Sequence, residues 1–340
     1  MPTIQHDNTP ASSGEPQPHP GDQHEIPNIE AHASSDSLKD RIKKHYEIAS
    51  DYYYSLWGQH IHHGLFRAAG ETKEQAQVNL ISLLLEISAL APRARVLDVG
   101  CGVGGTSRFL ARERACHVTG ITISGRQVEI ARQLTAAETG SSSPAQTTMA
   151  YPEKDGSQGA VRFLELDAEK MVEHFRGGGD GDKDAFDCVW ISEALSHLPD
   201  KELFFASSFA LLRGGGGGEG GGLLVVADWF KAPGLTAAQE EADIKPIEDG
   251  MLLPRLYTAD EYVAMAEKAG FRVRRAPVDI SKDVAKTWDI SWSLVSSPSL
   301  WAFAISQGRD GLAFLQAFRA MRRGYANGTF RYAVICFEKP

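Results

Sequence analysis

The sequence predicts an α/β fold in which a seven-stranded, mostly parallel sheet carries helices on both faces. Short apolar runs alternate with helical patterns between residues 96 and 337, an alternation typical of parallel strands joined by crossover helices. The first apolar run, residues 96–99, ends in a glycine-rich turn that leads into a helix. In such sheets ligands bind at the carboxyl ends of the strands, so this turn is the first place to expect a site.

Each element has its own local signal. Apolar, β-prone runs predict strands at residues 96–99, 116–123, 161–166, 186–191, 223–228, 271–278 and 330–337. Helices are expected at residues 36–55, from Thr106, from Ser124, and at residues 199–212 and 258–269. Ser124 with Gln127, and Thr258 with Glu261, have the spacing of a capping box. Segments 138–159, 177–184 and 214–222 have biased polar or glycine-rich composition and are predicted to be loops.

Length and composition favour one decorated domain. The chain has 340 residues, of which 42% are hydrophobic, enough for a substantial core. Residues 1–35 have almost no large apolar side chains and are predicted to form a disordered tail. Residues 36–340 are expected to form a single domain with an N-terminal helical cap (36–90) and helical lid insertions (231–256 and 281–327). The second insertion carries aromatic side chains that would suit a flat apolar ligand, although they could simply be core: Trp288, Trp292, Trp301, Phe303, Phe314 and Phe318.

Charge and cysteine usage exclude several functional classes. A net charge of -9 provides no basic surface for nucleic acid. No apolar run reaches the roughly 18 residues of a membrane span, and residues 1–35 lack the pattern of a secretory signal. The four cysteines have no metal-binding spacing and are predicted to be reduced, as in a cytoplasmic protein: Cys101, Cys116, Cys188 and Cys336. The expected partner is a small molecule, and an apolar lid face could also serve as a homodimer contact.

The glycine turn predicts a nucleotide-type cofactor. Gly100, Gly102 and Gly105 satisfy the dinucleotide fingerprint, in which glycines let the backbone approach the ligand. Asp98 lies two residues before the first glycine, where it would repel a pyrophosphate but attract a cationic amine such as that of S-adenosylmethionine. The second strand also ends without the acid that NAD enzymes use to hold the ribose. These residues favour S-adenosylmethionine over NAD.

The motifs D-V-G-C-G-V-G-G at residues 98–105 and G-I-T-I-S-G-R-Q at residues 120–127 resemble class I S-adenosylmethionine-dependent methyltransferases. Within that class the chain is most similar to the gamma-tocopherol methyltransferase-like small-molecule enzymes, with the cyclopropane fatty acid synthase group as a near relative. The resemblance covers about residues 40–340, with further matches at Tyr46 and residues 57–64, 193–200 and 331–334. It implies a Rossmann-like class I methyltransferase fold and methyl transfer to O, N or C of a largely apolar small molecule, such as an aromatic or specialised metabolite.

The resemblance and the residue chemistry together give a candidate site. The candidates for binding the cofactor are Tyr46, Asp98, Gly100, Gly102, Gly104, Thr122, Gln127, Asp167, Ala168 and Glu193. Asp167 would accept from the adenine amine, or could simply cap a helix. His62, His63 and His197 are candidate bases for deprotonating the acceptor, or could simply pack. Glu193 and His197 have the i, i+4 spacing of a metal pair, but without a third ligand no metal is expected.

Some alternatives remain open at this point. Thr122 could only fill a strand position, and Gln127 could only cap its helix. Alkene methylation of a lipid, as in the cyclopropane group, is a rival reaction that the acidic net charge disfavours. A regulatory protein that binds the cofactor without catalysis and an NAD oxidoreductase are rivals of other classes. Asp98 and the missing ribose acid disfavour the oxidoreductase.

Overall fold

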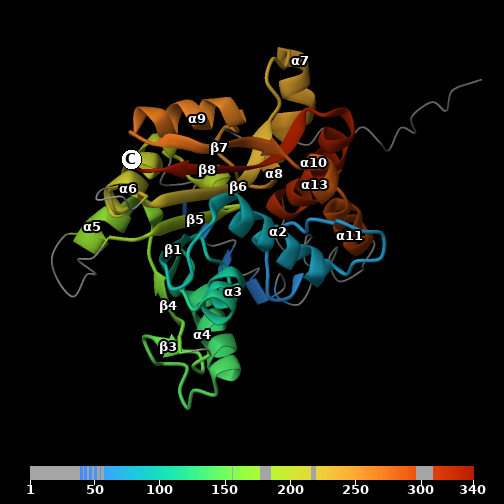
Figure 1. The fold of residues 1–340 in the computed structure, drawn as a ribbon. Coiled ribbons are helices and arrows are strands. Elements are labelled where there is room, and N and C mark those ends of the chain that lie inside the picture. Colours follow the sequence, from blue (N-terminus) through green and yellow to red (C-terminus); the bar gives the residue numbers. More distant parts are fainter. Residues whose placement is uncertain are drawn as a thin grey trace, which may run out of the picture.

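The computed structural model describes residues 57–154, 156–176, 185–215, 220–295 and 309–340, together with scattered residues between 39 and 54. Its centre is an eight-stranded sheet in the order β3-β4-β2-β1-β5-β6-β8-β7 (Figure 1). The strands are β1 (Arg95–Val99), β2 (His117–Thr122), β3 (Met149–Ala150), β4 (Ala160–Glu165), β5 (Cys188–Ser192), β6 (Leu223–Lys231), β7 (Arg272–Asp279) and β8 (Phe330–Glu338). The α/β class predicted from the sequence is confirmed.

The sheet contains all seven predicted strands and one that was not predicted. Strands β4, β2, β1, β5 and β6 pair in parallel, and β8 runs antiparallel between β6 and β7. The additional strand is β3, whose two residues pair antiparallel with β4. It lies within segment 138–159, which was expected to be only a loop. A two-residue strand is too short to carry an alternating pattern, so the sequence contains no signal for it.

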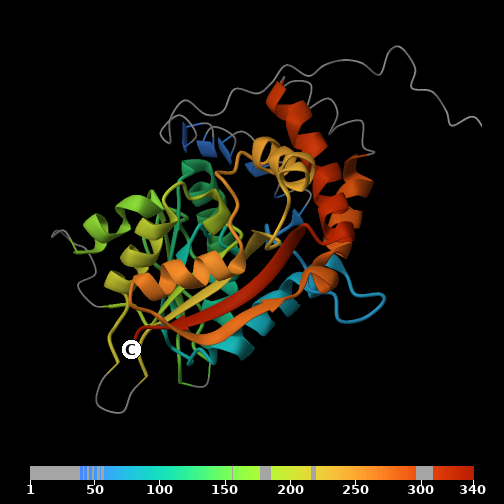
Figure 2. The same ribbon diagram turned by 90° about the horizontal axis from the view of Figure 1, so that it is seen from above.

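Helices cover both faces of the sheet, as Figure 1 and Figure 2 show. One buried cluster joins the sheet to α2 (Lys73–Ser88), α3 (Gly105–Arg114), α4 (Gly125–Thr139), α8 (Lys245–Gly250), α10 (Ser281–Val284), α11 (Lys286–Val295) and α13 (Arg309–Asn327). A second cluster joins the other face to α5 (Met171–Arg176), α6 (Lys201–Leu211) and α9 (Ala259–Lys268). Along β5, Cys188 and Trp190 enter the first cluster while Val189 and Ile191 enter the second. Burial on both faces explains why the strands read as continuous apolar runs.

The predicted helix caps are confirmed in one case and partly wrong in the other. Thr258 and Glu261 form the predicted capping box at the start of α9. Ser124 caps α4 by accepting from the Gln127 N–H, but the Gln127 side chain does not return to Ser124. Its Oε1 accepts from the Thr122 hydroxyl at 2.6 Å instead. The Gln127 carboxamide, which the capping box would have used, is therefore hydrogen-bonded to Thr122 at the end of β2.

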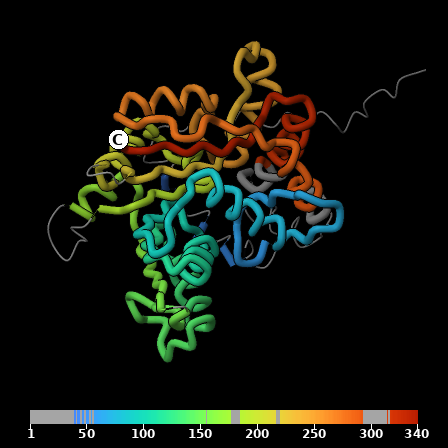
Figure 3. Tube along the Cα trace, in the orientation of Figure 1, coloured from blue at the N-terminus to red at the C-terminus, as the bar shows by residue number. Residues whose placement is uncertain are grey.

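Both segments expected as lid insertions contain helices in their described parts. Residues 231–256 contain α7 (Ala237–Gln239), a π-helical turn (Glu240–Ile244) and α8. Residues 281–327 contain α10, α11 and α13, and α13 packs beside α8 (Figure 3). Trp301 and Phe303 lie outside the described residues. No helix in the described part of the chain is both long and apolar enough to cross a bilayer. The four cysteines are free, as predicted.

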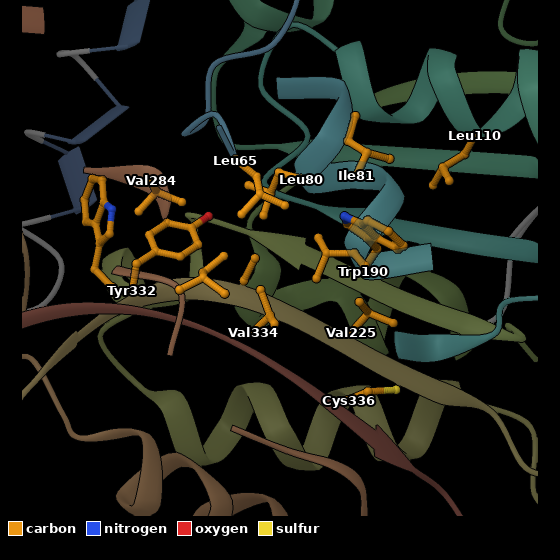
Figure 4. Close-up of a cluster of buried hydrophobic side chains, with 14 of the residues drawn as sticks. Leu65, Leu80, Ile81, Leu110, Trp190, Val225, Val284, Tyr332, Val334 and Cys336 are labelled. Carbon is orange, nitrogen blue, oxygen red and sulfur yellow. The ribbon is translucent and has the colours of Figure 1, made fainter. Parts of the chain in front are cut away.

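Strand β8 contributes alternating side chains to the first cluster. Tyr332, Val334 and Cys336 point to the same side and pack with Leu80 and Trp190 (Figure 4). Tyr332 is completely buried. Because a buried phenol needs a hydrogen-bond partner, its position directs attention to the polar groups nearby.

Candidate active site

A pocket lies at the carboxyl ends of the parallel strands, where the loops after β1, β2, β4 and β5 meet. We call it the sheet-edge pocket. It is lined by eight of the ten predicted cofactor residues: Tyr46, Gly100, Gly102, Thr122, Gln127, Asp167, Ala168 and Glu193. The crossover connections bring these separate loops to one edge of the sheet, where doubly wound folds bind their ligands.

The glycine turn presents bare backbone to this pocket. Gly100 and Gly102 have φ values of +73° and +54°, a region that side-chain-bearing residues rarely adopt. A Cβ on Gly100 would collide with the Cβ of Ala194 in the neighbouring loop, whereas Gly102 has open space on its Cβ side. The turn therefore needs Gly100 for its packing and leaves room for a ligand against Gly102.

Two predicted residues, Asp98 and Gly104, lie next to the pocket and not on its wall. Asp98 is 3% exposed, and its Oδ2 accepts from the Ser107 hydroxyl at 2.5 Å. Burial raises the pKa of Asp98 to about 6, although the Ser107 hydrogen bond opposes this rise. Gly104 is the N-cap of α3, and a Cβ there would lie 2.5 Å from the Phe163 ring. Its visible role is to let the helix approach β4.

The remaining wall of the pocket carries polar groups suited to a nucleoside. Thr122 accepts from the Ser124 N–H at 3.3 Å and donates to Gln127, so the carboxamide is held in one orientation. Asp167 caps the short 3₁₀ helix Ala168–Lys170 by accepting from Glu169 N–H at 3.0 Å. The helix cap that the sequence left as the alternative role is therefore present. It occupies Oδ1, while Lys39 Nζ lies 3.2 Å from Oδ2. Each carboxylate oxygen can accept a second hydrogen bond, so the cap does not exclude ligand binding.

Part of the N-terminal segment lies over this pocket. Its described residues between 39 and 54 are helical, and Ile42 and Tyr46 line the pocket. Four charged residues at i, i+4 spacing form what we call the charged stripe: Lys39, Lys43, Glu47 and Asp51. Lys39 pairs with Asp167 and Glu169, and Lys43 pairs with Glu165. Glu47 accepts from the Ser124 hydroxyl, and Asp51 pairs with Arg126. The charged stripe holds this segment against the ends of β4 and α4.

A second pocket adjoins the first, and we call it the aromatic pocket. Its wall includes Trp57, Trp229, Met251, Trp288 and Phe318. It shares Tyr46, Ile61, Glu193 and His197 with the sheet-edge pocket. The two cavities therefore meet at a common wall. Burial and nearby carboxylates raise the pKa of Tyr46 to about 12, so its phenol stays protonated at neutral pH.

All three predicted histidines line the aromatic pocket. His63 has its Nδ1 2.9 Å from Glu193 Oε2, and its backbone N–H donates to Oε1 at 2.6 Å. His62 donates from Nδ1 to the His63 carbonyl at 2.8 Å, and burial lowers the pKa of His62. His197 lies at the junction with its ring centroid 6.1 Å from that of Tyr46.

Several residues of the site were not predicted from the sequence. Lys39 and Ile42 line the sheet-edge pocket, while Trp229 and Thr287 line the aromatic pocket. Trp229 lies near the end of a fully buried strand, which in sequence looks like ordinary core. Tyr332 lies in a segment that resembles the family, but the sequence indicates no role for it; its hydroxyl donates to Glu193 Oε1 at 2.8 Å.

Comparison with known proteins agrees with this geometry. A family model described as mycolic acid cyclopropane synthetase matches residues 33–180. The chain is 29% identical to a probable tocopherol O-methyltransferase of Oryza sativa subsp. japonica, covering 89% of this chain and 79% of that one. It is 25% identical to a tocopherol O-methyltransferase of Arabidopsis thaliana, covering 91% and 85%. Other relatives are described as rifamycin and sterol methyltransferases.

A solved structure shares the fold. The cyclopropane synthase MmaA2 of Mycobacterium tuberculosis superposes with a TM-score of 0.68 at 20% identity, covering 88% of this chain and 98% of that one. The relatives are described as methyltransferases, two of them as O-methyltransferases and one as a C-methyltransferase. The chain is an S-adenosylmethionine-dependent methyltransferase, and it is similar to class I small-molecule methyltransferases over most of its length.

Proposed function

We propose that the enzyme transfers the methyl group of S-adenosylmethionine to a hydroxyl oxygen of a largely apolar, ring-bearing small molecule. The observation that carries this proposal is the wall shared by the two pockets. A cofactor held in the sheet-edge pocket and an acceptor held among the tryptophans would meet there. His62 and His63 lie on the acceptor side and His197 lies on the shared wall, where a hydroxyl proton must be removed.

The sheet-edge pocket has the donor and acceptor groups that S-adenosylmethionine requires. Gly100 and Gly102 would place backbone against the methionine and ribose portions. Asp167 would accept from the adenine amine while the Ala168 N–H faces the ring. Tyr46 would close over the methionine end, as the sequence resemblance implies. When bound, the cofactor supplies an electrophilic methyl group on a sulfonium.

The aromatic pocket favours a flat, apolar acceptor. Trp229 and Trp288 are each 5% exposed, and their ring centroids lie 6.4 Å apart. Such surfaces bind rings by burial and stacking. Methyl transfer is an in-line displacement, so orienting the two reactants can supply much of the rate acceleration, about 7–11 kcal/mol in well-aligned systems. The protein's main task is therefore alignment, with one added proton acceptor.

A carbon acceptor is the second candidate. Two comparisons favour it, because the family model is described by cyclopropane synthesis and one relative as a 24-methylenesterol C-methyltransferase. Methylation of an alkene also needs a base, since a proton leaves after the methyl arrives. The same pocket could therefore serve either reaction, and the product must decide.

The test is incubation with methyl-deuterated S-adenosylmethionine and a metabolite extract from the protein's own source, followed by mass spectrometry. We expect a labelled product whose fragments place the methyl on oxygen. A label on carbon would support the second candidate. Cofactor binding by calorimetry without any labelled product would instead favour a regulatory protein, and a failure to bind would contradict both candidates.

We also propose a cytoplasmic enzyme. The four free cysteines support this, since reduced thiols are usual there. Two plant relatives are described as chloroplastic. Fractionation of cells that express the tagged chain distinguishes the two compartments.

A further inference from the structure

Glu193 lies at the centre of a buried polar network between the two pockets. It follows β5 directly, and its φ of +55° is unusual for a residue with a side chain. Its backbone N–H donates to Ala227 O at 2.8 Å, which anchors this conformation against β6. Strained backbone of this kind persists where the surrounding structure holds a side chain in a required place.

Both carboxylate oxygens of Glu193 are occupied by protein donors. Oε1 accepts from the His63 backbone N–H at 2.6 Å and from the Tyr332 hydroxyl at 2.8 Å. Oε2 lies 2.9 Å from His63 Nδ1. The side chains of Glu193 and His63 are 8% and 3% exposed. Burial alone would raise the pKa of Glu193, but the charge and hydrogen bonds of His63 outweigh it and hold this pKa below its usual value.

This arrangement determines the tautomer of His63. An ionised carboxylate only accepts hydrogen bonds, so Nδ1 must carry a proton, and in the neutral imidazole the lone pair is then on Nε2. Nε2 is buried, and none of the described residues offers it a hydrogen-bond partner. The imidazole is surrounded by aromatic rings, including those of Trp288 and Tyr332 with centroids 5.0 Å away. An unpartnered acceptor atom thus lies on a residue that lines the aromatic pocket.

We propose that Glu193 and Tyr332 are positioning residues that act through His63, and that His63 Nε2 is the atom that takes the proton from the methyl acceptor. The reaction itself rests on the proposed function. The assignment moves Glu193 from the cofactor set to the acceptor side. It also gives Tyr332 a role that no sequence motif suggested.

The transfer balances as follows. The acceptor's O–H bond breaks and its proton moves to His63 Nε2. The oxygen forms a bond to the methyl carbon, and the carbon–sulfur bond breaks with its electron pair remaining on sulfur as a neutral thioether. His63 becomes an imidazolium whose charge is stabilised by the Glu193 carboxylate. The imidazolium then loses its proton to solvent when the products leave.

Tyr332 keeps the carboxylate in place. Its ring is completely buried on β8, from which it points into the first cluster (Figure 4). Burial and the neighbouring Glu193 raise the pKa of Tyr332 well above its usual value, so the phenol remains a donor. Without this donor the carboxylate would lose one of the three hydrogen bonds that hold it. Removing the hydroxyl should therefore loosen the position of Glu193 while leaving its charge and the Nδ1–H tautomer of His63 in place.

The experiment compares E193Q and Y332F by two measurements. The first follows the His63 ring by nitrogen-resolved NMR across pH, with H63N identifying its signals. We expect the Nδ1–H tautomer in the wild type. E193Q should lose the uniform Nδ1–H tautomer, because a carboxamide can donate to Nδ1 as well as accept from it, whereas Y332F keeps the carboxylate and should retain this tautomer. A merely structural role would not separate the two variants in this way.

The other titratable groups near the imidazole must be accounted for. His62 precedes it in the chain, Tyr325 of α13 has its ring centroid 6.3 Å away, and Asp228 of β6 interacts with Glu193. These groups are the same in both variants and so cannot produce a difference in tautomer between them. E248Q is the matched control because Glu248 is a half-buried carboxylate of α8 outside both pockets. It should leave the His63 signals where they are.

The second measurement separates the acceptor side from the cofactor side. In E193Q we expect kcat to fall at least 100-fold, because a neutral carboxamide no longer enforces the tautomer, while the cofactor Kd changes less than about 2-fold. In Y332F kcat should fall about 3- to 10-fold. A 10-fold or larger rise in the cofactor Kd of E193Q would return Glu193 to the cofactor site and overturn the proposal. So would an Nε2–H tautomer in the wild type. If no acceptor is methylated, the proposed function fails, and the NMR result still decides the arrangement.

Discussion

The hydroxyl of Ser107 donates to Asp98 Oδ2 inside the protein, 2.5 Å away and beneath the glycine turn. Both side chains are buried. The carboxylate is buried and does not line the sheet-edge pocket, although Gly100 and Gly102 of the turn that follows it do. We therefore expect it to act on a bound cofactor through its charge, while the backbone of the turn makes the direct contacts. Cofactor affinity should then depend on pH.

We predict that cofactor affinity rises as pH rises through about 6. Burial raises the pKa of Asp98 to about 6, so the carboxyl is neutral below that pH and attracts no cation. The cationic cofactor favours the ionised form, and binding near pH 6 should release a proton. Calorimetry between pH 5 and 7.5, in buffers of different ionisation enthalpy, measures both effects. D98N should lose the pH dependence and bind about 10-fold more weakly at pH 7.5.

Asp228 supplies the control for this prediction. Burial also raises its pKa to about 6, but it lies outside both pockets and accepts from the Ser196 and Trp229 N–H groups. D228N should keep the pH dependence of cofactor binding. If D228N loses it and D98N keeps it, the assignment of the charge to Asp98 is wrong.

The glycine turn gives a second prediction, in which three Gly→Ala variants separate strain from ligand contact. Gly100, Gly102 and Gly140 all have positive φ, so each alanine carries a backbone cost of about 1 kcal/mol. G100A adds a collision with Ala194 and should lose the most stability. G102A and G140A meet nothing within 4 Å. Only G102A, which faces the pocket, should combine near-control stability with at least 10-fold weaker cofactor binding.

Thermal unfolding and calorimetry on the same samples check this order. G140A is the matched control because Gly140 ends α4 at a distance from the pocket wall. Equal cofactor binding by G102A and G140A would show that the ligand does not lie against the turn.

Local patterns predicted the sheet because each strand carries its own signal. The apolar residues 96–99 and the glycines that follow them are contiguous, so the sequence alone predicts a strand that ends in a ligand-binding turn. Strand β3 lacked such a signal, since two residues show no period. The capping box at Ser124 failed because Gln127 had a competing partner at the end of β2. The spacing rule for a capping box does not take such competing hydrogen bonds into account.

The site's most specific contacts have no local signature. His63, Glu193 and Tyr332 are separated by 130 and 139 residues along the chain, and only the sheet order brings them together. Ser107 could be named as a helix residue, but not as the partner of Asp98. The charged stripe is visible as an i, i+4 pattern, whereas its partners lie on distant loops. The sequence therefore located most of the pocket but not the hydrogen bonds that orient it.

The charged stripe yields a third prediction. Lys43 pairs with Glu165 at 2.7 Å, and neither residue lines the pocket. K43E should repel Glu165, loosen the N-terminal segment and raise the cofactor Kd about 2- to 5-fold at 50 mM salt, because exposed pairs contribute about 1 kcal/mol or less. The double variant K43E/E165K should restore binding. At 500 mM salt the differences should shrink through screening. A K43E variant that binds normally at low salt would show that this contact does not control access.

The aromatic pocket yields the last prediction. Trp288 is buried with its ring centroid 5.0 Å from that of His63 and 5.4 Å from that of Phe318. W288A should lower kcat/KM for the acceptor at least 10-fold, because the ring surface and the packing of the imidazole are both lost. The cofactor Kd should be unchanged, since Trp288 lines only the aromatic pocket.

Removing a buried tryptophan costs about 3–5 kcal/mol of stability, so the loss of activity needs a control. F175A removes a ring from the second cluster, on the opposite face of the sheet, and should destabilise the fold without changing acceptor KM. W288F keeps a ring in the pocket and should fall between wild type and W288A in kcat/KM. If F175A and W288A lose acceptor affinity equally, the effect comes from general loosening of the fold. If only W288A loses it, the acceptor binds against this tryptophan.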